Sequence, residues 1–156
     1  MGLILSIITI SAWLALTLMI DIAVVPTVFR NSSQIFEAGH IGIILFTLLN
    51  RLEILFASVV FLTSFKWARH RLITFISAFL VILILCYNFL LTPGITQAAK
   101  KMEAHQAATD FSQGFAKAQD EHRQYHDLYK VLDSTKMFLL LGLLIYAARE
   151  NKRRFQ

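Results

Sequence analysis

The chain has 156 residues, of which 56% are hydrophobic and only 16% are charged, and its formal net charge is +5. A typical soluble domain has about 25% charged residues and a disordered chain has few large apolar ones, so this composition excludes both classes. Cys86 is the single cysteine, which excludes an intrachain disulfide and a metal cluster held by several thiolates.

Four long apolar segments predict membrane-spanning helices, because a helix needs about 20 apolar residues to cross the hydrocarbon layer. Residues 72–92 contain no charge, and the other segments contain only a few. The first segment has no basic start and is too long for a cleaved signal peptide, so we interpret it as a membrane helix. We expect one membrane domain, residues 1–156, with spans at about 2–22, 45–65, 72–92 and 131–149.

The residues between the first two spans predict that one helix ends there and that another begins. Pro26 is expected to kink or end the first helix, because proline cannot continue the backbone hydrogen bonds. Asn31, with Gln34 three residues later, has the pattern of a cap and favours a new helix at this point.

The long connection of about 93–130 also reads as helical. Apolar and small side chains recur in it every three or four residues, which is the helical period. We predict a helical hairpin with its tip near Thr109 and Asp110. Its second arm would run from Phe111 into the fourth span and reach Arg149, a length of about 58 Å, longer than any bilayer is thick. The expected fold class is therefore all-α: an integral membrane four-helix bundle with an extramembrane helical hairpin between spans three and four.

Basic residues predict the orientation. The link of residues 66–71 and the tail from Arg149 hold seven basic residues and one acid, whereas the rest of the chain holds eight basic residues and nine acids. By the positive-inside rule, both termini are expected in the cytoplasm, and we expect a bacterial inner membrane. The basic excess then indicates contact with the lipid bilayer and not nucleic-acid binding.

Ionisable and polar side chains occur at a similar depth in all four spans: Asp21, Arg51, Glu53, Asn88, Asp133 and Lys136. Such residues are costly inside a membrane and need partners. Asp133 and Lys136 are three apart and are expected to pair. Arg51 is expected to pair with Asp21 or Asp133, and Glu53 with Lys136 or Arg30, since Arg51 and Glu53 point to nearly opposite sides of their helix. Two interpretations remain open: an ion-pair layer that fixes helix register, or a solvated mouth that admits a cation or carries protons.

The histidines on the expected outer side form a candidate metal site. His122 and His126 are four apart, a spacing that lets two imidazoles share a divalent metal. A third ligand from His105 or His40 would be required, and packed or solvated histidines are the alternative. A b-type haem needs two histidines facing each other inside the bundle, and His40 and His126 lie too far out, so haem is not expected.

Four short stretches resemble one family: residues 25–30 (VPTVFR), 38–46 (AGHIGIILF), 92–95 (TPGI) and 125–129 (YHDLY). In them the chain resembles the transmembrane protein 205-like family of small four-span membrane proteins (domain of unknown function 4149). Tyr125 stands where that family has leucine before the histidine. The resemblance implies the same four-span fold and a link with metal or drug tolerance, without an agreed substrate or catalytic residue. It points to Pro26, Phe29, Gly39 and His126.

Two functional hypotheses follow. The first is a membrane protein that handles a small cation or metal at its outer polar layer, as a transporter component or a binding accessory. Since four spans are few for a transport path, it would act as a homo-oligomer. The alternative is a non-transporting scaffold or assembly partner that docks a membrane protein on Phe111, Phe115, Tyr125 and Tyr129 of the hairpin. An enzyme is less expected, because the sequence has no nucleophile constellation, no phosphate-binding glycine loop and no C-x-x-C pair.

Overall fold

The structure, a computed structural model, describes residues 2–32, 35–68, 71–107 and 113–154. Its elements in chain order are α1 (Gly2–Leu18), the π-helical segment η1 (Met19–Val24), α2 (Val25–Asn31), α3 (Ile35–Trp67), α4 (Arg71–Cys86), the π-helical segment η2 (Tyr87–Leu91), α5 (Thr92–Ala107) and α6 (Gln113–Arg154). They form four rods that are long and apolar enough to cross a membrane: Gly2–Asn31, Glu37–Trp67, Arg71–His105 and Gly114–Arg153. The expected all-α four-helix bundle of an integral membrane protein is confirmed.

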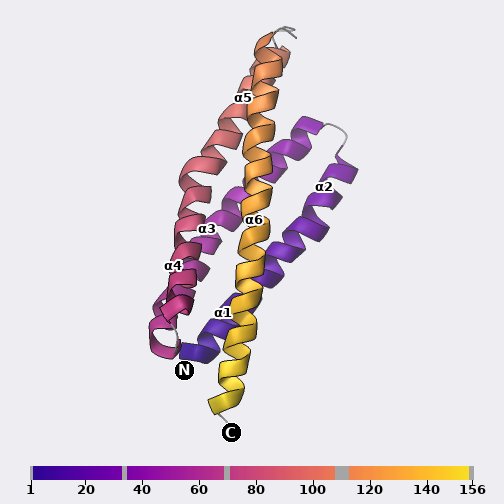
Figure 1. Cartoon of the computed structure of the whole chain (residues 1–156). Helices are drawn as coiled ribbons and strands as arrows, with labels where there is room; N and C mark the ends of the chain where they lie inside the picture. Colours follow the sequence, from indigo (N-terminus) through magenta and orange to yellow (C-terminus); the bar gives the residue numbers. More distant parts are fainter. Residues whose placement is uncertain (1, 33–34, 69–70, 108–112, 155–156) are drawn as a thin grey trace.

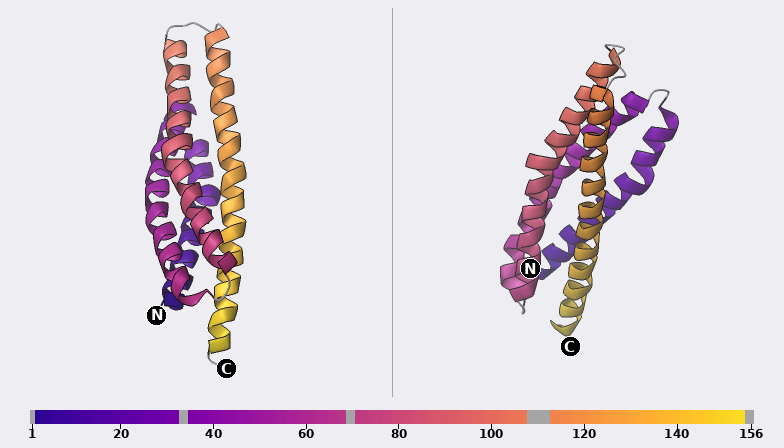
Figure 2. Two further views of the ribbon diagram at one scale, coloured as in Figure 1. Left: turned by 60° about the vertical axis from the view of Figure 1, so that its left-hand side comes forward. Right: turned by 45° about the horizontal axis from the view of Figure 1, so that its top comes forward.

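The rods run alternately up and down, so that both termini lie at one end of the bundle and the α5–α6 hairpin lies at the other (Figure 1). These are called the terminal end and the hairpin end below. Helix α1 packs against α3 and α6, α3 also packs against α4, and α5 packs along α6. Toward the hairpin end, α2 and the start of α3 lean away from α5 and α6, so two arms diverge (Figure 2).

The hairpin is present as expected. Helix α6 has 42 residues, which makes it about 63 Å long at 1.5 Å per residue. Since the hydrocarbon layer is about 30 Å thick, a large part of α6 must project beyond it. The hairpin arms extend past α2 and α3 (Figure 1). The expected tip at Thr109 and Asp110, like Phe111, lies outside the described residues.

Proline does not end either helix in which it occurs. Pro26 and Pro93 are each the second residue after a π-helical segment, Met19–Val24 and Tyr87–Leu91 respectively. A proline ring collides with the carbonyl four residues earlier and offers no N–H, and a wider π-helical turn in front of it accommodates both defects. The helices therefore continue through the prolines, so of the two expected effects of Pro26, a kink or a helix end, the helix end does not occur.

Asn31 does not cap α3. It is the last residue of α2, where its side-chain Nδ2 donates a hydrogen bond to the Thr27 carbonyl oxygen at 2.8 Å. Helix α3 begins at Ile35, and Gln34, the other half of the expected cap pair, lies outside the described residues. The amide thus satisfies the end of the preceding helix and not the start of the next.

The polarity of the bundle is inverted relative to a water-soluble protein. Leu62, Phe75 and Phe138 are 64%, 70% and 75% exposed, whereas the side chains of Glu53 and Lys136 are fully buried. An apolar side chain on the outside costs nothing in lipid, and a charged one there is costly, so this distribution suits a membrane. Between the charged residues and the terminal end, the core is mostly apolar, with Ile10, Val60, Leu80 and Leu140, and it also holds the buried hydroxyls of Ser6, Ser64 and Ser77.

The terminal end is closed by a tryptophan. Trp67, the last residue of α3, is buried, and its Nε1 donates to Ser6 Oγ of α1 at 2.7 Å. Ser6 Oγ lies 2.5 Å from Thr63 Oγ1, which itself donates to the Val59 carbonyl oxygen at 2.7 Å. Ser6 therefore donates to Thr63 and accepts from Trp67, and this pair of contacts joins α1 to α3.

We predict that Trp67→Phe lowers the free energy of unfolding by about 1–3 kcal/mol, because it removes the hydrogen bond to Ser6 and part of a buried ring. Thermal unfolding in detergent measures the change. Phe65→Leu is the control, since Phe65 is 64% exposed and its replacement should change stability by no more than about 0.5 kcal/mol. Equal midpoints for Trp67→Phe and the wild type would contradict the prediction.

Candidate functional site: a buried charge layer

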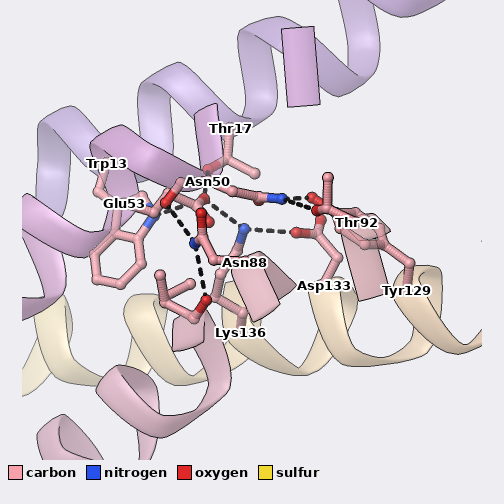
Figure 3. A network of polar contacts seen from close by, with 10 residues as sticks. Trp13, Thr17, Asn50, Glu53, Asn88, Thr92, Tyr129, Asp133 and Lys136 are labelled. Atoms are coloured by element: carbon pink, nitrogen blue, oxygen red, sulfur yellow. Dashed lines mark hydrogen bonds and ion pairs between the residues drawn. The ribbon is translucent and has the colours of Figure 1, made fainter. Parts of the chain in front are cut away.

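Glu53 of α3 is the centre of a polar cluster inside the bundle. Its Oε1 accepts hydrogen bonds from Lys136 Nζ at 2.6 Å, Trp13 Nε1 at 2.8 Å and Thr17 Oγ1 at 3.3 Å (Figure 3). These donors come from α6 and α1. The other oxygen, Oε2, is buried and has no hydrogen-bond partner among the described residues. Glu53 thus ties three helices together and keeps one acceptor atom unused.

Lys136 of α6 forms ion pairs with two carboxylates. Its Nζ lies 2.6 Å from Glu53 Oε1 and 2.5 Å from Oδ1 of Asp133, one turn earlier on the same helix. The ammonium also lies 5.5 Å from the centroid of the Tyr87 ring, within the range of a cation–π interaction. The expected pairs of Lys136 with Asp133 and with Glu53 are both confirmed.

A third carboxyl group completes what we call the charge layer, defined as Asp21, Glu53, Asp133 and Lys136. The carboxyl of Asp21, in η1, lies within interaction distance of the Asp133 carboxyl and of the Lys136 ammonium. Two carboxyl groups held close together favour the uptake of a proton by one of them. The layer therefore holds three acids against one ammonium, a formal charge of −2 that a single shared proton reduces to −1.

An amide cluster lies beside the charge layer, toward the hairpin end. Asn50 Nδ2 donates to Thr92 Oγ1 at 2.9 Å, and Asn50 Oδ1 accepts from the Tyr129 hydroxyl at 3.1 Å. Asn88, as expected, belongs to the same level: its Nδ2 donates to the Asn50 carbonyl oxygen at 3.0 Å. These contacts connect α3 with α6 and with the rod of η2 and α5, and Trp13 and Thr17 of α1 bring in the fourth rod at the polar level (Figure 3).

The expectation that Arg51 pairs with Asp21 or Asp133 is wrong. Arg51 lies on the exposed face of α3 and makes no ion pair within the described part of the chain. The helical geometry explains this: Glu53 faces the bundle, and a residue two positions away must point to nearly the opposite side. Arg30, the other expected partner of Glu53, is also exposed, on α2. Lys136 is left as the cation of the layer.

A cavity of about 590 Å³ lies between the two arms at the hairpin end. Its walls come from α2, the first part of α3, α5 and α6, and Phe46, Thr92 and Tyr129 line it nearest to the charge layer. Because Thr92 and Tyr129 also bind Asn50, the cavity and the amide cluster share residues. His40, His122 and His126 line the same cavity.

The expected histidine metal site is not assembled. The rings of His122 and His126 are stacked with centroids 6.1 Å apart, but the described residues contain no group of three histidine, cysteine or acidic side chains that could hold a metal ion. His105 is packed elsewhere, against Gly114, where an added Cβ would come within 2.6 Å of its Cε1. The residue proposed as third ligand thus stabilises the close approach of α5 and α6.

Both stacked histidines favour the neutral form. Burial lowers the pKa of His122 below its usual range. Burial also lowers the pKa of His126, helped by the nearby Lys130 and His122 and opposed by Asp127. An imidazole that is neutral at neutral pH offers one hydrogen-bond donor and one acceptor to the cavity.

Trp13, Thr17 and Tyr129 are hydrogen-bond donors in the polar clusters that the sequence pattern did not identify as such. Trp13 and Thr17 were hidden in an apolar span, although their spacing of four places both on one helix face, and Tyr129 was assigned to the outer surface of the hairpin. In the structure all three donate to Glu53 or Asn50. A polar pair at helical spacing in an otherwise apolar span is the signal that would have found the first two.

Comparison of the chain with models of known protein families, with curated proteins and with solved structures finds no match. The resemblance to the transmembrane protein 205-like family stays a prediction. Any functional inference therefore depends on the geometry of the charge layer and the cavity.

The shared ammonium leads to an asymmetric prediction. Lys136→Met leaves both carboxylates buried without their cation and should lower the free energy of unfolding by about 3–5 kcal/mol. Glu53→Gln should cost less, because Lys136 keeps Asp133. Thermal unfolding in detergent measures both, and the double variant should be more stable than the sum of the single losses indicates. A larger loss for Glu53→Gln than for Lys136→Met would contradict the arrangement.

The neutral histidines lead to a pH prediction. Their pKa values are lower in the folded protein than the ordinary value of 6.5, so their contribution to stability is complete above that pH and is lost as the pH falls through the lowered values. The unfolding midpoint should therefore fall more steeply between pH 7.5 and about pH 5 for the wild type than for the variant His122→Gln/His126→Gln. Parallel pH curves for the two proteins would count against this reading.

Proposed function

We propose that this membrane protein binds and releases a small cation, the proton above all, at the charge layer, as a transporter component or a binding accessory. The observation that carries the proposal is the convergence of three carboxyl groups, those of Asp21, Glu53 and Asp133, on the single ammonium of Lys136. A net negative charge held inside a membrane protein needs a counter-charge.

A purely structural ion-pair layer would balance its charges. An uncompensated charge in a medium of low dielectric constant is unfavourable in free energy, so such a layer tends to bind a positive charge that neutralises it. A proton compensates the charge and takes up the least space, and the closeness of the Asp21 and Asp133 carboxyl groups favours its uptake. The unpartnered Oε2 of Glu53 is a second acceptor for a proton or a small cation.

Access to the layer is favoured from one side. Toward the terminal end the helices are sealed by apolar side chains such as Ile10, Leu80 and Leu140, each fully buried. Toward the hairpin end, Tyr129 and Thr92 line the cavity and are hydrogen-bonded to Asn50. The hydroxyl and amide groups of Tyr129, Thr92 and Asn50 thus offer a proton a path from the cavity toward the layer.

The charge distribution of the chain favours a particular orientation of this path. Residues 66–71 and the tail from Arg149 carry most of the basic excess, and such segments remain in the cytoplasm. In this orientation both termini are cytoplasmic, and the cavity opens on the far side of the membrane, for which we propose a bacterial inner membrane.

The scaffold alternative is less favoured. Of its four expected contact residues, Phe115 lines the cavity and Tyr129 is buried in the amide cluster. Tyr125 packs on Gly94, where an added Cβ would lie 2.8 Å from its Cε1, and Phe111 lies outside the described residues. Less aromatic surface of the described hairpin is thus open to a partner than this hypothesis needs.

Infrared difference spectra between alkaline and acidic pH test the proposal. We expect a protonated-carboxyl band in the wild type that Asp21→Asn and Asp133→Asn each reduce by at least about half, since each substitution removes one of the two neighbouring carboxyl groups. Asp120→Asn is the matched control, because Asp120 is exposed and pairs with Arg123 at 2.7 Å outside the layer. A band that all three variants leave unchanged would refute proton binding here.

Flux measurements separate the two roles. In liposomes that enclose a pH-sensitive dye, a transporter component should dissipate a pH gradient at least about tenfold faster than protein-free liposomes, and Asp21→Asn should abolish the difference. A binding accessory should keep the carboxyl band and show no added flux. Unfolding midpoints measured in parallel identify any variant that has merely lost its fold.

A further inference from the structure

The cavity at the hairpin end is apolar over most of its wall. Val25 and Phe29 of α2, Ile43 and Phe46 of α3, and Ile95 and Met102 of α5 line it. Polar groups lie on three of the helices: His40 on α3, Lys100 and Glu103 on α5, and Gln119, His122 and His126 on α6. An apolar enclosure with a few converging polar groups is the usual form of a small-molecule site, and about 590 Å³ lies within the common range for one.

Two glycines keep the cavity open. Gly39 and Gly42 are three residues apart on α3 and both line it. Gly42 is buried, yet a Cβ added to it or to Gly39 would meet no atom within 4 Å. Buried positions are normally close-packed, so the empty space at Gly42 is part of the cavity itself. Glycine inside a helix costs stability, and here it removes the side chains that would fill the hollow.

The position of the cavity indicates where an apolar ligand would lie. From Arg71 to Thr92, at the cavity floor, the helix rises about 32 Å, which is close to the thickness of the hydrocarbon layer. From Thr92 to Glu103 the cavity wall rises about 16 Å more. The cavity therefore begins near the edge of the hydrocarbon layer and continues beyond it, where exposed apolar chains would otherwise meet water.

The charges in the wall restrict the polar part of the ligand. Lys100 and Glu103 contribute one charge of each sign, and the lowered pKa values of His122 and His126 keep these imidazoles neutral at neutral pH. Apart from His40 on α3, the wall thus has no net charge, and it offers donors and acceptors from the imidazoles and Gln119. A head group with no net charge matches this wall better than an anionic one.

We propose that the cavity binds an amphiphile with one apolar chain and a polar head group of no net charge, such as a zwitterionic lipid head. The apolar chain lies along Phe46 and Ile95, and the head group contacts His122, His126 and Gln119. The site is separate from the charge layer, and its occupancy does not depend on cation binding. Asp21→Asn should accordingly leave it intact.

Photo-crosslinking with a lysophosphatidylcholine that carries a diazirine on its chain tests the site in detergent-purified full-length protein. We expect labelling of the cavity-lining segments around Phe46, Ile95 and His126. Gly42→Leu, which fills the hollow, should reduce this labelling at least about fivefold. Gly142→Leu is the control, because Gly142 is exposed on α6, lines no cavity and has no atom within 4 Å of an added Cβ. If Gly42→Leu fails to fold, Gly39→Leu replaces it.

Two further probes test which head group the cavity prefers and from where the ligand enters it. Unlabelled lysophosphatidylglycerol, which is anionic, should compete at least about fivefold less well than lysophosphatidylcholine, and equal competition would overturn the head-group assignment. If the ligand enters the cavity from the bilayer, phosphatidylcholine with a diazirine on its chain should label the same segments in nanodiscs. If only the added lysolipid labels them, the site is supported and its ligand enters from the aqueous phase. Labelling restricted to lipid-facing residues, or unchanged in a folded Gly42→Leu protein, would overturn the proposal.

Discussion

The ammonium of Lys136 holds the centre of this bundle together. It is fully buried and binds Glu53 of α3 and Asp133 of its own helix at 2.6 and 2.5 Å. Glu53 in turn receives Trp13 and Thr17 of α1. A buried ion pair contributes little net stability, but it penalises any other register of the helices, because a shift of one turn would leave these charges unpaired. We infer that this interaction selects how α1, α3 and α6 meet.

The prolines and the charge layer are linked through backbone geometry. Asp21 and Asn88 both lie five residues before a proline, inside the π-helical segments η1 and η2. An inserted π-helical turn rotates the residues that follow it relative to a regular helix, so it changes which side chains face the bundle. Both segments occur at the level where polar groups are required to meet. The local irregularity that Pro26 and Pro93 impose thus coincides with the polar level of the bundle.

The sequence predicts the fold well, because long apolar segments indicate the membrane spans and helical periodicity indicates the hairpin. It also predicts the pairs of Lys136, since these follow from spacing along one helix and from the scarcity of cations. The error at Arg51 arose because a cation in a span was assumed to face inward, whereas the position of Glu53 dictates the reverse. The metal site with His105 was inferred across two helices, and a pattern on one helix does not determine the relative rotation of its neighbour. The cavity could not be predicted from the pattern of apolar residues, because it depends on the angle between the two arms and on the absence of side chains at Gly39 and Gly42.

The two sites are stacked along one axis and share the residues between them. Tyr129 and Thr92 form the floor of the cavity and bind Asn50 in the amide cluster. An occupant of the cavity would displace water from this floor, and in a drier environment the hydrogen bonds and the charge interactions beneath it strengthen. Departures from ideal helix packing, two glycines above and two π-helical segments below, concentrate in this stretch, as expected where a chain gives up local stability for a site.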